Sequence, residues 1–218
     1  YAAILDEEKQ KERHYVACVD CTGHGVPGGF MSMIGYSLFN EIVIINRIKD
    51  PASILEHLNQ AIRHALQQDK KEKGHEVNTD GMDVSLCMFE YLDEEACLVT
   101  FSGAKTTLYY THKNRNEILQ LKGDKKTIGG IQTHKERQFS NQQLLLKRGD
   151  TLYLMSDGYC DQNNADRIKF GTVRLLETLQ KIAHQPMEKQ KDILELTLEV
   201  HQGDAPQRDD ITILGIRL

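Results

Sequence analysis

Residues 19–32 have the sequence Val-Asp-Cys-Thr-Gly-His-Gly-Val-Pro-Gly-Gly-Phe-Met-Ser. The apolar run at 14–20 ends on the carboxylate of Asp20 and is typical of a strand. The glycines that follow indicate a tight turn, and apolar residues then recur at helical spacing over 28–47. A carboxylate at a strand end beside such a turn suits a hard cation or a phosphate, because both bind oxygen or N–H groups at fixed positions.

The composition indicates one soluble globular domain. The chain has 218 residues, of which 39% are hydrophobic and 27% charged, with a net charge of -5. Without an excess of Lys and Arg, nucleic acid is not an expected partner. The longest apolar run, 41–46, is far shorter than the roughly 20 residues of a membrane span, so we expect no membrane insertion by this segment. The five cysteines are scattered, a pattern that does not indicate a disulfide framework and favours the reducing cytoplasm.

The pattern along the chain predicts an α+β fold. Two antiparallel strands, 1–5 and 14–20, come first, and helices follow at 28–47 and 51–67. Further strands are expected at 84–91, 96–102, 107–112, 117–121, 138–146 and 150–156. Helices at 173–183 and 187–200 precede a last strand at 211–217. Because helices occur in pairs and strands in runs, the arrangement is that of sheets packed on each other and covered by helices.

Acidic residues stand at strand ends in three places. Asp20 ends one strand, Asp157 follows the apolar run 152–155, and Asp209 and Asp210 precede the last strand. In antiparallel sheets these ends can meet at one edge. Clustered carboxylates repel one another unless a cation neutralises them, which indicates Mg²⁺ or Mn²⁺. Two such ions sharing a water favour hydrolysis of a phosphoester.

Four blocks of the sequence, in this order, resemble the SpoIIE-type branch of the PPM (PP2C-like) metal-dependent serine/threonine phosphatases. The blocks are Asp20-Cys-Thr-Gly-His-Gly-Val-Pro-Gly-Gly-Phe-Met-Ser, Phe101-Ser-Gly-Ala, Gly149-Asp-Thr-Leu-Tyr-Leu-Met-Ser-Asp157-Gly-Tyr and Arg208-Asp-Asp-Ile-Thr-Ile-Leu. The resemblance covers nearly the whole chain. It implies a four-layer αββα sandwich of two mainly antiparallel sheets flanked by helix pairs, with two metal ions at one edge.

The resemblance also implies the roles of the site residues. Asp20 takes the place of the carboxylate that contacts both ions, and the backbone carbonyl of Cys21 contacts the second ion. Asp157 and Asp209 complete the first metal site, and these aspartates form the catalytic centre at which a metal-bound water attacks phosphorus. Asp210 and Asp83 are weaker candidates, and Asp83 is explained equally well by a hairpin turn.

The same resemblance places the chain in bacterial signalling. It implies a phosphoprotein substrate such as an anti-sigma-factor antagonist, an upstream sensor or regulatory domain, and a homodimer. The family carries a further acid in a Gly-Asp-aromatic element of its first strand, which would end at Tyr1. We therefore expect residues 1–218 to be a single C-terminal output domain that lacks this acid, with a weakened second metal site.

The sequence also has features that suggest three other interpretations. The glycines at 23, 25 and 28 match the G-x-G-x-x-G pattern of dinucleotide-binding folds, but a second helix and then antiparallel-looking strands follow. His24 is better explained as a turn residue than as a general acid. The alternative to an enzyme is a catalytically impaired PPM-like binding module, although such a module has no reason to keep like charges on one edge.

Overall fold

The strands form two antiparallel sheets. The computed structural model describes residues 2–6, 11–23, 25–69, 78–115, 117–132 and 137–218. In the first sheet the strand order is β1 (Ala2–Asp6), β2 (Lys11–Cys21), β3 (Gly81–Tyr91), β4 (Ala96–Ala104) and β8 (Gln142–Lys147), and the short β7 (Ile128–Gly129) also pairs with β3. In the second sheet the order is β10 (Ile213–Arg217), β9 (Thr151–Met155), β5 (Thr107–Thr111) and β6 (Leu119–Lys122). The antiparallel neighbours of β2 exclude the dinucleotide-binding fold.

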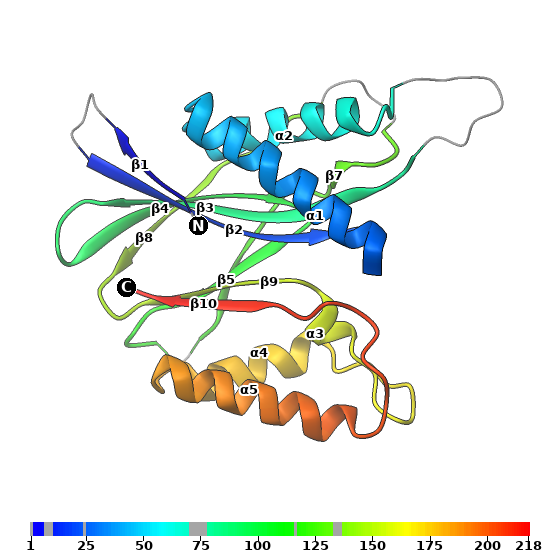
Figure 1. Ribbon diagram of the computed structural model, residues 1–218. Helices are drawn as coiled ribbons and strands as arrows, with labels where there is room; N and C mark the ends of the chain where they lie inside the picture. The colour runs from blue at the N-terminus through cyan, green and yellow to red at the C-terminus, as the bar shows by residue number, and fades with distance from the viewer. Residues whose placement is uncertain (1, 7–10, 24, 70–77, 116, 133–136) are drawn as a thin grey trace.

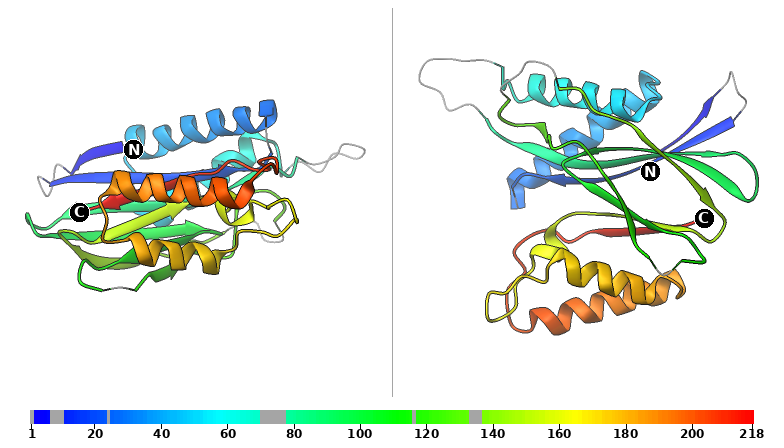
Figure 2. Two further views of the ribbon diagram at one scale, coloured as in Figure 1. Left: turned by 90° about the horizontal axis from the view of Figure 1, so that it is seen from below. Right: turned by 180° about the vertical axis from the view of Figure 1, so that it is seen from behind.

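Helices cover the outer face of each sheet. Figure 1 shows α1 (Gly25–Asn40) and α2 (Pro51–Ala65) on the first sheet, and α4 (Thr172–Ile182) and α5 (Met187–Gln202) on the second. The view from behind in Figure 2 shows the same four layers. Three hydrophobic clusters fill the spaces between successive layers. The predicted αββα sandwich is therefore confirmed.

Side chains on β2 alternate between two of these clusters. Tyr15 packs in the cluster under α1 and α2, whereas Cys18 packs between the two sheets. Because neighbouring side chains in a strand point to opposite faces, Cys21 belongs to the helix side and Asp20 to the space between the sheets. Cys18 and Cys21 thus lie on opposite faces of β2.

Helix α2 has a capping residue at its start and an apolar stripe along one side. The Asp50 carboxylate caps it by accepting a hydrogen bond from the Ser53 N–H at 2.9 Å, and Pro51 occupies the first turn, where its missing N–H costs nothing. Its apolar stripe, which includes Ile54, Leu58 and Ile62, is fully buried against the first sheet. This helix therefore fixes the layer on which α1 rests.

Several element bounds differ from the sequence prediction. The predicted helix 28–47 begins three residues earlier, and its end, Glu41–Ile45, is a π-helix. The strand predicted at 138–146 begins only at Gln142, because the Ser140 N–H and hydroxyl both donate to Asp124 Oδ2 at 2.8 Å. The one-turn helix α3 (Gly158–Asp161) and β7 escaped the prediction, since elements this short have no periodicity.

One helical segment in the described part of the chain, Gly25–Ile45, is long and apolar enough to cross a bilayer by length and composition. In the fold, Met31 and Ile42 of this segment are buried in the cluster over the first sheet. Phe30 and Met33 are each more than half exposed, whereas Tyr36, also more than half exposed, borders the groove between α1 and β2. The segment is thus a covering helix of the sandwich with an apolar outer face.

Candidate active site

Two carboxylates of the first sheet face each other across neighbouring strands. Asp20 on β2 stands directly opposite Asp83 on β3 in the antiparallel register. Side chains in such a pair lie on the same face of the sheet, about 5 Å apart at Cβ. Both carboxylates therefore enter the space between the sheets, at the end where β9 of the second sheet finishes.

The acids of the second sheet are held together by one serine. Asp157 follows β9, and Asp209 and Asp210 lie shortly before β10. The Ser156 hydroxyl donates to the Asp210 carbonyl at 3.0 Å and accepts from the Thr212 N–H at 3.0 Å. The backbones of Gly158 and Asp210 also approach each other closely, since a Cβ on Gly158 would lie 2.4 Å from the Asp210 carbonyl oxygen. The segment 209–210 is thereby fixed beside Asp157.

The carboxylates of the two sheets interact electrostatically. The pKa of Asp20 is raised to about 6, first by burial and then by the charges of Asp157, Asp209, Asp83 and Asp210. Partial desolvation of its carboxylate also raises the pKa of Asp157, and the charges of Asp161, Asp209 and Asp83 add to that effect. The structure therefore brings together every aspartate that the sequence singles out. Asp20 is half-buried, whereas Asp157, Asp209 and Asp210 are exposed.

A glycine loop forms one wall of this edge. Gly23 and Gly25 adopt φ values of +91° and +66°, which other residues rarely adopt. A Cβ on Gly28 would lie 2.6 Å from the Gly23 carbonyl oxygen, so the start of α1 closes tightly onto the loop. A small cavity of about 60 Å³ lies where this loop meets Asp20 and Ser156. His24 lies outside the described residues.

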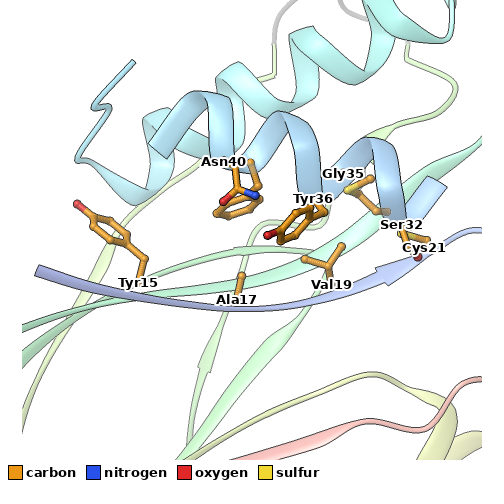
Figure 3. A pocket seen from close by; sticks show the side chains of 10 residues that line it. Tyr15, Ala17, Val19, Cys21, Ser32, Gly35, Tyr36 and Asn40 are labelled. Atoms are coloured by element: carbon orange, nitrogen blue, oxygen red, sulfur yellow. The ribbon is translucent and has the colours of Figure 1, made fainter. Parts of the chain in front are cut away.

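Cys21 contributes no side chain to this edge. Its thiol lies on the helix side near Ser32, as Figure 3 shows, in a groove of about 240 Å³ between β2 and α1. Burial raises the pKa of the Cys21 thiol, while a hydrogen bond with Ser32 lowers it. The residue can therefore serve the carboxylate edge through its backbone carbonyl alone. The groove itself is lined mainly by apolar side chains, including Tyr36 and Phe39, and offers no chemistry for a phosphoester.

Lys105 is the residue of this edge that sequence reasoning missed. Its Nζ lies 2.8 Å from Asp83 Oδ2. The pKa of Lys105 is raised by the hydrogen bond to Asp83 and by the negative charge of Asp83. The negative charges of Asp157 and Asp20 raise it further. The block Phe101-Ser-Gly-Ala ends one residue before this lysine, but only the pairing of β3 with β4 brings the lysine to Asp83.

The donor set at this edge fits a hard divalent cation. Among the described residues, no three His, Cys, Asp or Glu side chains are arranged to hold an ion. The chemistry of the donors nevertheless favours one: several carboxylates share an edge, and the raised pKa values of Asp20 and Asp157 mean that their charges are poorly compensated. Oxygen ligands of this kind suit Mg²⁺ and Mn²⁺.

The fold is that of a PP2C-type phosphatase domain. A profile of the SpoIIE family (Stage II sporulation protein E) matches residues 10–218, and the chain therefore belongs to this family. The SiaA-PP2C domain of Pseudomonas aeruginosa is 32% identical, with a TM-score of 0.77 over 94% of this chain and 80% of that one. The comparison with curated protein sequences returned no match.

Two more distant structures share the fold. The PP2C phosphatase domain of SpoIIE from Bacillus subtilis, solved with a fragment of its regulatory domain, has a TM-score of 0.67 at 17% identity and covers all of this chain. The chain spans 58% of that structure. RsbX in complex with magnesium has a TM-score of 0.55 at 15% identity, over 98% of this chain and 83% of that one. The predicted family membership is confirmed, and the chain is a protein phosphatase domain of the PP2C type.

Proposed function

We propose that this domain hydrolyses phosphoserine and phosphothreonine in a protein substrate by direct attack of water on phosphorus. The observation that carries the proposal is the convergence of Asp20 and Asp83 from one sheet with Asp157 and Asp209 from the other. In this reaction an oxygen–phosphorus bond to water forms as the bond to the serine or threonine oxygen breaks. The products are phosphate and the free hydroxyl.

Two Mg²⁺ or Mn²⁺ ions are the cofactors that this proposal requires. Asp20 would contact both ions, Asp157 and Asp209 would hold the first, and the Cys21 carbonyl would serve the second. Asp210 and Asp83 are weaker contributors. When bound, such ions lower the pKa of a coordinated water and offset the charge on the phosphoryl group.

Hydrogen bonds within the chain hold the segments that carry these carboxylates in place. Ser156 holds the segment 209–210 at its place beside Asp157 through two hydrogen bonds. The Thr22 N–H donates to the Gly81 carbonyl at 2.9 Å, which ties the glycine loop to β3 next to Asp83. Both sheets thus contribute carboxylates to one edge of the sandwich, where the glycines let the backbone approach closely.

Hydrolysis of a phosphoserine peptide in Mn²⁺, with and without EDTA, tests the proposal. Asp157→Ala should abolish the metal-dependent rate and leave the fold intact, because it removes a member of a repelling cluster. Asp192→Ala, on the exposed face of α5, is the matched control and should keep the wild-type rate. An unchanged rate in Asp157→Ala would refute the assignment. A folded wild-type chain without EDTA-sensitive hydrolysis would favour the catalytically impaired binding module instead.

Membership of the family supports a proposal about the biological setting. We propose a cytoplasmic signalling domain that acts on a small phosphoprotein such as an anti-sigma-factor antagonist. An upstream sensor or regulatory domain and self-association into a homodimer belong to the same proposal. Phosphatase assays on candidate phosphoproteins, with sedimentation of the purified chain, test the substrate and the homodimer separately.

A further inference from the structure

We propose that Lys105 binds the phosphoryl group of the substrate. This inference rests on the proposed function and adds a residue that the carboxylate motifs do not include. Lys105 combines three features that a solvated turn lysine does not need: a strained backbone, a firmly anchored turn, and a position between the carboxylates of the two sheets.

The backbone of Lys105 is held in an unfavourable conformation. Its φ is +59°, in the left-handed region that residues other than glycine, asparagine and aspartate seldom adopt. Such a conformation is energetically unfavourable and persists only where the surrounding structure imposes it. The unfavourable conformation of Lys105 beside the candidate active site therefore indicates a functional role for this residue.

The turn that carries Lys105 is anchored on three sides. The Lys105 N–H donates to the Asp124 carbonyl at 2.7 Å, and the Asp124 N–H donates to the Gly103 carbonyl at 2.8 Å. The Thr106 hydroxyl donates to the Val84 carbonyl at 2.9 Å. Gly103 and Gly123 pack so closely that a Cβ on Gly123 would lie 2.5 Å from the Gly103 carbonyl oxygen. The position of the lysine is therefore set by the fold.

The turn brings the ammonium group to the junction of the two sheets. Val84 pairs with Ala104, so Lys105 comes one step beyond this pair, next to Asp83, which itself pairs with Asp20. The chain passes here from β4 of the first sheet to β5 of the second. Lys105 thus extends the cross-strand row of Asp20 and Asp83, and its positive charge also acts on Asp157.

A phosphate ester is the ligand class that this position favours. A phosphoryl dianion that approaches the acidic edge is repelled by carboxylates unless cations offset them. The Lys105 side chain is 62% exposed, so its ammonium can leave Asp83 for a ligand at little desolvation cost. Its three donors suit the non-bridging oxygens of a phosphate. When metal ions neutralise the aspartates, the ion pair with Asp83 weakens and the ammonium becomes available.

Binding of inorganic phosphate tests this inference without turnover. Calorimetric titration of the Mg²⁺-loaded chain should give a dissociation constant about tenfold larger for Lys105→Met than for the wild type, which is the effect of losing one charge-assisted hydrogen bond. Lys105→Arg should recover most of the affinity. Lys125→Met, an exposed lysine on the neighbouring turn, is the control and should bind as the wild type does.

The outcomes separate this inference from the proposed function. Equal phosphate affinity in wild type and Lys105→Met would overturn the role of Lys105, as would the absence of phosphate binding in the wild type. If Lys105→Met changes only the Mg²⁺ affinity, the lysine acts as a counter-charge to Asp83 and the inference also fails. A phosphate-binding chain without hydrolysis would refute the proposed function and leave the role of Lys105 supported. Where hydrolysis occurs, KM should rise about tenfold in Lys105→Met, with a smaller change in kcat.

Discussion

Metal binding at the acidic edge should depend on pH through Asp20. A carboxyl group with a pKa of about 6 is about nine-tenths ionised at pH 7 and about one-tenth ionised at pH 5. Because a cation binds the ionised form, the apparent Mn²⁺ affinity should fall about tenfold over this range, or about 1.4 kcal/mol of binding free energy. An aspartate with its ordinary pKa would stay ionised over the same range and give almost no change.

The assay is a titration of the protein with Mn²⁺ at each pH, in which free Mn²⁺ is followed by its paramagnetic resonance signal at constant ionic strength. Asp20→Asn should bind weakly and lose the dependence on pH between 5 and 7. Asp192→Asn, far from the edge, should keep the wild-type profile. Equal wild-type affinity at pH 5 and pH 7 would refute the reasoning, and the same loss in Asp20→Asn would assign the titration to another group.

Three further substitutions test the packing at the site and away from it. Gly158→Ala places a methyl group 2.4 Å from the Asp210 carbonyl oxygen and should weaken Mn²⁺ binding at least about tenfold, which the same titration measures. Gly29→Ala has nothing within 4 Å of the new Cβ and should stabilise α1 by about 0.5–1 kcal/mol in urea unfolding, with unchanged Mn²⁺ affinity. Tyr153→Phe removes the buried hydrogen bond to Gln190 Oε1 at 2.8 Å and should lower the free energy of unfolding by about 1–3 kcal/mol without affecting Mn²⁺ binding; a loss below about 0.3 kcal/mol would contradict this account.

The sequence predicts the layers and the acidic edge well because both depend on local patterns. Each sheet and helix pair has its own periodicity, and Asp20, Asp157 and Asp209 each stand at the end of a recognisable strand. The αββα arrangement and the family follow from these blocks and are confirmed. The catalytic and metal-binding roles of the aspartates remain predictions.

What the sequence cannot predict depends on contacts between distant segments. Lys105 reaches Asp83 only through the β3–β4 register, and the preceding block Phe101-Ser-Gly-Ala does not by itself indicate this contact. The start of β8 moves to Gln142 because Asp124, 16 residues earlier, supplies the hydrogen-bond acceptor for Ser140. Strand propensity alone favours an earlier start, and the distant carboxylate overrides it.

Carboxylates lie near both ends of β9, and their pKa values are shifted in opposite directions. Asp150, just before the strand, is 4% exposed. Burial alone would raise its pKa, but hydrogen bonds from the Lys147 N–H, the His112 ring and the Lys113 N–H together lower it. Asp157, just after the strand, has a raised pKa.

Lowering the pH should therefore change the stability contributed at the two ends of β9 in opposite directions. The stabilising contribution of Asp150 is present above its unfolded-state pKa of about 4 and is lost as the pH falls below that value. The repulsion at the other end is present above about pH 6 and is relieved as Asp20 takes up a proton between pH 6 and pH 4. Without divalent cations, these groups together favour greatest stability in mild acid, near pH 4 to 5. Saturation with cations removes the repulsion at neutral pH, so the stability optimum moves toward neutral pH.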